Sequence, residues 1–145
     1  MAIQDDYAEV MQSGVPGAIA DTANKDLMSR TVEGAAIGFG LPLAQGDTDY
    51  GVRATTTGDT EIVGITVRDQ STFGDEFAVG DSARVLEKGT IWVTTAVAVA
   101  ARDDVLVTVA DGSFTNVVAA GNVAIDGARF DDTGDANAVV RIRLT

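Results

Sequence analysis

The sequence contains no cysteine and no histidine. The chain therefore has no thiolate nucleophile, no disulfide, no imidazole base and no histidine or cysteine ligand for zinc. Serine is scarce, and there is no histidine to activate it. These absences exclude most of the usual routes to catalysis. We expect a protein that is not an enzyme and that binds no cofactor.

Positive charge is also scarce, with 10 Lys and Arg against 22 Asp and Glu and a formal net charge of −12. Such an acidic surface repels the phosphates of nucleic acids and anionic lipids. No apolar run approaches the ~20 residues needed to cross a bilayer. The N-terminus, MAIQDDYAEV, lacks the charged-then-apolar pattern of a secretory signal. We expect no nucleic acid and no membrane as partner, and a protein that stays in the cytoplasm or travels with a particle.

Residues 1–30 show no strand-like alternation, and polar residues separate their few apolar ones. One interpretation is a frayed terminus or a short helix over residues 5–12. The other is an extended N-terminal arm that becomes ordered on a partner, with apolar side chains as anchors. The candidate anchors are Ile3, Tyr7, Val10, Met11, Val15 and Pro16.

From residue 31 onward, short apolar runs alternate with Gly, Asp, Asn and Thr, which predicts an all-β domain over residues 31–145. Val63, Ile65 and Val67 fall on one face of a half-buried strand. Gly89-Thr90 and Asp111-Gly112 are predicted as tight turns, the first of them a hairpin. The expected fold is a single antiparallel barrel or sandwich, of jelly-roll or β-tulip type. Further strands are predicted at residues 82–86, 91–94, 105–109, 128–130 and 139–144, and residues 94–103 as strand or loop.

Two aromatic residues in the β domain are candidate interface residues. Trp92 faces away from the core if Ile91 and Val93 face inward, and exposed aromatics are enriched at subunit interfaces. Packing within the sheet is the more common role of a lone Trp on a strand. Phe39 lies between two glycines and is followed by Leu41-Pro42-Leu43. Because proline cannot donate to a ladder, this segment is predicted to be an edge strand or a bulge, where another chain can add a strand.

The charged clusters have ordinary structural interpretations. Asp131, Asp132 and Asp135 resemble a metal loop in composition but lack the order of ligands of a calcium loop, so a solvated turn is favoured and no metal is expected. Arg141 and Arg143 share one face of the last strand. We favour their pairing with Asp or Glu across the strands, worth ~0.2–1 kcal/mol each, over contact with an acidic neighbour.

Several short segments follow one another in a recognisable order along nearly the whole chain. They are Pro16-Gly17, Gly38-Phe39-Gly40, Gly64-Ile65, Gly89 with Trp92-Val93, Ala128 and Phe130, and Arg143-Leu144. In this order they resemble the structural cement proteins of tailed phages. One departure is Arg102-Asp103-Asp104, where a Gly-Asp-Pro-like turn is expected.

The resemblance implies a β-rich decoration module on the outer surface of the virion, where it binds the major capsid protein and stabilises the head without catalysis. It also implies a homo-oligomer, and we favour a trimer over a dimer. Phe39 and Trp92, together with the six arm anchors, are the candidate contacts with the capsid or a neighbouring subunit. The alternative is a carbohydrate-binding module on the virion surface, which needs a cluster of exposed aromatic residues in a groove.

Overall fold

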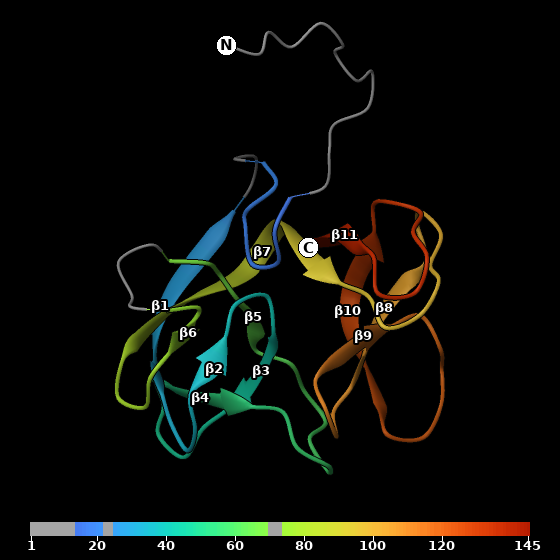
Figure 1. Ribbon diagram of the computed structural model, residues 1–145. Helices are drawn as coiled ribbons and strands as arrows, with labels where there is room; N and C mark the ends of the chain where they lie inside the picture. Colours follow the sequence, from blue (N-terminus) through green and yellow to red (C-terminus); the bar gives the residue numbers. More distant parts are fainter. Residues whose placement is uncertain (1–13, 22–24, 70–73) are drawn as a thin grey trace, which may run out of the picture.

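The computed structural model describes residues 14–21, 25–69 and 74–145, and these form strands and loops with no helix (Figure 1). The prediction of an all-β protein is confirmed. Within the described ranges, no helix has the length and apolar character to span a bilayer. The strands are β1 (Asp26–Val32), β2 (Ile37–Gly38), β3 (Pro42–Gln45), β4 (Gly51–Ala54), β5 (Gly64–Thr66), β6 (Glu76–Phe77), β7 (Ser82–Thr94), β8 (Asp104–Thr108), β9 (Ser113–Thr115), β10 (Asn122–Phe130) and β11 (Val139–Leu144).

The first half of the molecule is a barrel made of β1, β4, β3, β5 and β7, closed because β1 pairs with both β4 and β7. The β1–β4 pairing is parallel, and the other pairings of the barrel are antiparallel. The short β2–β6 ribbon packs against it and adds Phe77 to its core, where the rings of Phe39 and Phe77 meet edge to face at 5.2 Å. This core consists of Val32, Ile37, Phe39, Leu43, Val52, Phe77, Ala83 and Val85.

The second half continues the same sheet beyond β7, in the order β7-β11-β10-β8-β9. An isolated bridge between Thr95 and Phe114 brings β9 back to the chain that follows β7. A second core joins the halves, because it includes Ile65 and Leu86 of the barrel as well as Phe130 and Ile142. In Figure 1 the barrel lies on the left and the second half on the right, with β7 extending from one to the other. The long strand β7 therefore belongs to both halves.

The predicted hairpin at Gly89-Thr90 is wrong, because β7 runs unbroken from Ser82 to Thr94. Gly89 has φ of 128° and lies opposite Leu144 of β11, while residues up to Lys88 pair with β1. Glycine permits a positive φ in a tight turn and equally in a strand that changes partners. The predicted turn at Asp111-Gly112 is confirmed, since it connects β8 to β9 with Gly112 at φ of 75°.

The expectation that Pro42 marks an edge strand is also wrong. Its strand, β3, lies between β4 and β5 and pairs with both. Pro42 is the first residue of that strand, a position where the missing N–H does not interrupt a ladder. The ambiguous residues after Thr94 form a loop, with isolated bridges at Thr95 and Val99. In this loop Arg102 has φ of 77°, at the turn that departs from the cement-protein pattern.

Candidate functional site

Residues 14–21, here called the anchor segment, lie along the side of β7 that does not pair with β11. The amide of Gly17 donates to the Trp92 carbonyl at 2.9 Å, and the Trp92 amide donates to Ala18 at 3.0 Å. The amide of Ala20 donates to Thr90 at 2.9 Å, and Ile19 bridges Ile91. The anchor segment therefore adds strand-like pairing to β7, and residues 26–30, which follow it within the predicted arm, belong to β1.

The side chain of Trp92 lies beneath the anchor segment and is only 7% exposed. Gly14 sits against the indole ring so closely that no β-carbon fits between them. The guanidinium carbon of Arg141 lies 5.5 Å from the ring centroid, within the range of a cation–π contact. Ile91 and Val93 on either side of Trp92 are fully buried. The indole ring is thus covered by residues of its own chain, and it is not open to a sugar.

Close backbone packing and two hydrogen bonds from Arg68 attach the anchor segment to the barrel. Gly17 and Gly40 both have positive φ, and a β-carbon on Gly17 would lie 2.8 Å from the Phe39 β-carbon and 2.9 Å from the Gly40 nitrogen. Arg68 donates from its backbone amide to the Gly17 carbonyl at 2.8 Å and from Nε to the Pro16 carbonyl at 3.2 Å. Only glycine allows the two backbones to approach this closely. Pro16-Gly17 and Phe39-Gly40 are therefore packed against each other.

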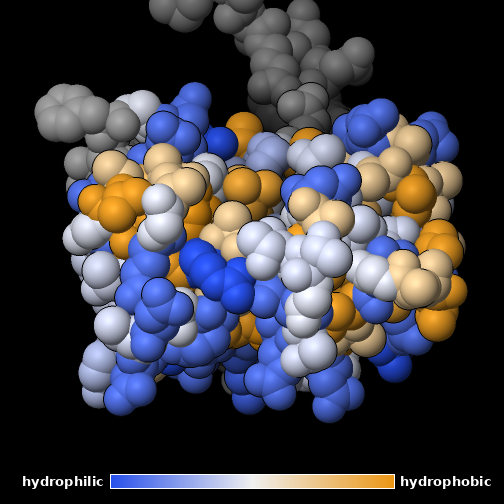
Figure 2. Space-filling model, turned by 90° about the horizontal axis from the view of Figure 1, so that it is seen from below, coloured by the Kyte–Doolittle hydropathy of each residue, from blue (hydrophilic) through white to orange (hydrophobic). Residues whose placement is uncertain are grey.

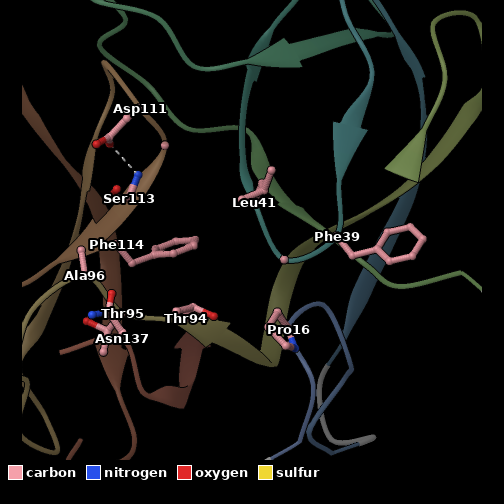
Figure 3. Close-up of a pocket in the computed structure, with 12 residues that line it drawn as sticks. Pro16, Phe39, Leu41, Thr94, Thr95, Ala96, Asp111, Ser113, Phe114 and Asn137 are labelled. Atoms are coloured by element: carbon pink, nitrogen blue, oxygen red, sulfur yellow. Dashed lines mark hydrogen bonds between the residues drawn. The ribbon is translucent and has the colours of Figure 1, made fainter. Parts of the chain in front are cut away.

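A cleft of about 410 Å³ separates the two halves of the molecule (Figure 3). Pro16, Phe39 and Leu41 line the barrel side, and the β8–β9 turn with Phe114 lines the opposite side. In that turn the Asp111 carboxylate accepts a hydrogen bond from the Ser113 amide at 3.0 Å. The remaining lining residues are Gly40, Thr94, Thr95, Ala96, Gly112 and Asn137.

The eight predicted interface residues are not brought together at one place in the part of the chain that the structure describes. Pro16 and Phe39 share the cleft, and Trp92 does not line it. Val15, beside Pro16, is 52% exposed. The other four anchors, Ile3, Tyr7, Val10 and Met11, lie outside the described residues, as does the alternative helix over residues 5–12.

The loop between β9 and β10 exposes an apolar surface that the sequence analysis missed. Val118 is 85% exposed, and Val117, Ala119 and Ala120 beside it are exposed as well. Asn122 fixes the loop by donating from Nδ2 to the Val117 carbonyl at 2.9 Å. The signal in the sequence is a run of four apolar residues between turn formers, in Asn116-Val-Val-Ala-Ala-Gly121. Figure 2 shows apolar patches at both sides of this face and near its centre, interspersed with polar surface.

The arginines of β11 form ion pairs, in agreement with the interpretation favoured from the sequence. Arg141 binds Asp132 through Nη2 at 2.7 Å and Nε at 3.0 Å, and its amide donates to the same carboxylate at 3.0 Å. These hydrogen bonds lower the pKa of Asp132 below its usual range. Arg143 pairs with Asp131 at 3.1 Å. The described part of the chain contains no group of three or more acidic residues arranged to hold a metal ion.

Comparison with known proteins decides the family. Residues 3–145 match the family model described as "Structural cement protein (E217 gp24/Pam3 gp6)". The chain belongs to the structural cement protein family. No curated protein sequence matches this cement protein.

Solved structures of phage proteins are similar to this cement protein. A chain in the capsid of Myoviridae phage XM1 superposes with a TM-score of 0.77 at 19% identity, over 100% of this chain and 98% of that chain. The head fiber gp8.5 N base of bacteriophage phi29 gives a TM-score of 0.49 at 13% identity, over 83% of this chain and 94% of that chain. The XM1 match covers the barrel and the second half alike, so the fold as a whole is shared.

Family membership establishes the general role of the cement protein. It is a structural component of the phage virion that associates with the capsid shell on its exterior and stabilises the capsid. In such a protein, the residues that matter for function are those that transmit force or contact neighbours. The anchor segment, the cleft and the exposed loop are the features of this chain that fit these tasks.

Proposed function

We propose that this cement protein binds the major capsid protein directly and holds the head together by many simultaneous surface contacts. The observation that carries the proposal is the hydrogen-bonded attachment of the anchor segment to β7. Residues 1–13 precede a segment fixed by backbone hydrogen bonds to the strand that both halves share. A force that a partner exerts on these residues is therefore transmitted to the whole β domain.

In this proposal residues 1–13 are the part of the arm that binds the major capsid protein. The side chains that enter apolar depressions on that partner are Ile3, Tyr7, Val10 and Met11. Val15 and Pro16 extend that contact at the base of the arm. Linked contacts raise one another's effective concentration, so individually weak contacts give stable occupancy. A homo-oligomer, with a trimer favoured, multiplies the number of arms that engage at once.

The test is deletion of residues 1–13, which leaves Gly14 over Trp92 and every hydrogen bond of the anchor segment to β7 in place. Purified heads that lack the protein are mixed with the full chain or with the truncated chain, and bound protein is measured by sedimentation and gel densitometry. We expect an unchanged circular dichroism spectrum and loss of binding to heads. Saturation of the heads by the truncated chain would refute the role of the arm.

A longer deletion is a poor test because it also damages the fold. Removal of residues 1–20 takes away the covering of Trp92 and the partners of the Trp92 and Thr90 backbone groups. A matched pair of full-length variants avoids this problem. Val10→Asp with Met11→Asp places charge on the arm and should abolish binding to heads, whereas Val79→Asp, at an exposed position in a loop of the barrel, should not.

A further inference from the structure

Three of the ten basic residues of this acidic chain line one cavity. Arg102, Arg129 and Arg143 surround a space of about 420 Å³ together with Ala101, Phe130 and Asp131. The cavity, here called the arginine pocket, lies where β10 and β11 meet the loop that precedes β8. It concentrates guanidinium groups on a protein whose formal net charge is −12. Such a pocket is suited to carboxylates, which guanidinium groups bind in a bidentate manner.

The backbone holds the three arginines close together. Arg129 and Arg143 lie directly opposite each other in the β10–β11 ladder. Two like charges in such a cross-strand pair destabilise a sheet. Arg102 is brought next to them because its amide donates to the Phe130 carbonyl at 2.6 Å. Its φ of 77° is a conformation that glycine adopts more easily than arginine.

The pocket retains free hydrogen-bonding capacity. Arg143 pairs with Asp131 at 3.1 Å, and Arg129 pairs with Asp104, yet the arginine side chains remain 54% and 49% exposed. Each guanidinium carries five N–H donors, more than these pairs use. Among the described residues, the Arg102 side chain has no hydrogen-bond or ion-pair partner. Arg102 therefore supplies a positive charge that no carboxylate of the described chain neutralises.

The N-terminal sequence offers a complementary segment. Residues 1–13, MAIQDDYAEVMQS, carry Asp5, Asp6 and Glu9 and no Lys or Arg. The segment ends at Gly14, which lies against Trp92, and an extended chain of this length reaches as far as ~45 Å.

We propose that the arginine pocket of one subunit binds the acidic residues Asp5, Asp6 and Glu9 of a second copy of this chain. Two copies with a net charge of −12 repel each other over most of their surfaces, so a contact between opposite charges favours self-association in this region. Reciprocal exchange of arms between two copies gives a dimer, and exchange around a higher axis gives a closed ring. This inference rests on the homo-oligomer of the proposed function and assigns its contact residues.

Full-length variants test the contact by exchange of charge. Arg102→Glu reverses the pocket, Asp5→Lys with Asp6→Lys reverses the arm, and Arg84→Glu is the matched control on an exposed site of β7. Sedimentation velocity is used to measure self-association. At about 0.1 M salt the pocket and arm variants should each raise the dissociation constant about tenfold, and the control should not. At about 1 M salt the wild-type chain should dissociate as well, because the Debye length falls to ~3 Å.

Mixing identifies the source of the arm. The pocket variant and the arm variant each associate weakly with themselves, and they should associate more tightly with each other when combined in equal amounts. A mixture that sediments as the two separate variants do would overturn the proposal. A wild-type chain that stays monomeric, or one whose association Arg102→Glu does not change, would overturn it as well.

Two further measurements separate other causes of failure. Arg102→Gly removes the guanidinium and relieves the positive φ, so it should fold at least as stably as the wild type and still lose association. If this variant associates normally, the pocket is not the contact. Binding to heads is measured in parallel. A chain that self-associates normally but does not bind heads contradicts the proposed capsid binding and leaves the proposed contact at the arginine pocket standing.

Discussion

Gly14 lies directly against the indole ring of Trp92, and a β-carbon added to Gly14 would stand 2.5 Å from the ring atoms Cδ1 and Nε1. The contact fixes the point where the N-terminal residues leave the β domain. It also explains why an aromatic residue between two inward-facing neighbours is nevertheless buried. The side chains of Ile91 and Val93 lie in the second core, whereas the anchor segment and Arg141 cover Trp92.

This contact predicts the effect of a larger residue at position 14. Gly14→Val forces the anchor segment away from β7, and overpacking of this kind lowers the free energy of unfolding by about 1–3 kcal/mol. Because Trp92 is the only tryptophan, its fluorescence reports the change directly. We expect emission at longer wavelength and a lower midpoint in urea. Val15→Ala, at the exposed neighbouring position, is the control and should change neither quantity. Unchanged fluorescence in Gly14→Val would show that Gly14 does not cover the ring.

The change of partners in β7 predicts a second effect. Gly89→Ala places a side chain at φ of 128°, with its β-carbon 3.2 Å from the Lys25 β-carbon. The backbone strain should lower the free energy of unfolding by about 1–3 kcal/mol. Gly38→Ala is the matched control, because Gly38 has no positive φ and its new β-carbon would meet Leu41 at an ordinary 3.4 Å. Both variants are compared by thermal and urea unfolding. Equal stability of the two variants would contradict the assigned role of Gly89.

Local patterns were sufficient to predict much of the β domain. The strand over residues 139–144 is present with the predicted bounds, and its alternation separates the paired arginines from buried Val140 and Ile142. The turn at Asp111-Gly112 is equally local. In both places the side-chain period or the turn chemistry is contained within a few consecutive residues.

Features that depend on pairing between residues far apart in the sequence could not be predicted from it. The continuity of β7 through Gly89 depends on Leu144 and Lys25, and the interior position of β3 depends on β4 and β5. The covering of Trp92 depends on Gly14, far away in the sequence. A single chain shows each of these residues but not which of them meet.

The ion pair between Asp132 and Arg141 predicts a dependence of stability on pH. The hydrogen bonds from Arg141 lower the pKa of Asp132 in the folded protein. A carboxyl group whose folded-state pKa is lowered stabilises the fold above its unfolded-state pKa of ~3.9. That contribution is lost as the pH falls through the lower folded-state value. Asp132→Asn removes the charge and leaves Arg141 in place above Trp92.

At pH 7 the variant Asp132→Asn should unfold with a free energy about 1 kcal/mol below that of the wild type, a modest value because both side chains are partly exposed. The difference should shrink as the pH is lowered below ~4. Urea unfolding at a series of pH values measures it. Asp135→Asn, an exposed side chain in the same turn, is the control and should differ little from the wild type at any pH. A difference for Asp132→Asn that stays constant from neutral to strongly acidic pH would show that its effect does not come from the ionised carboxylate.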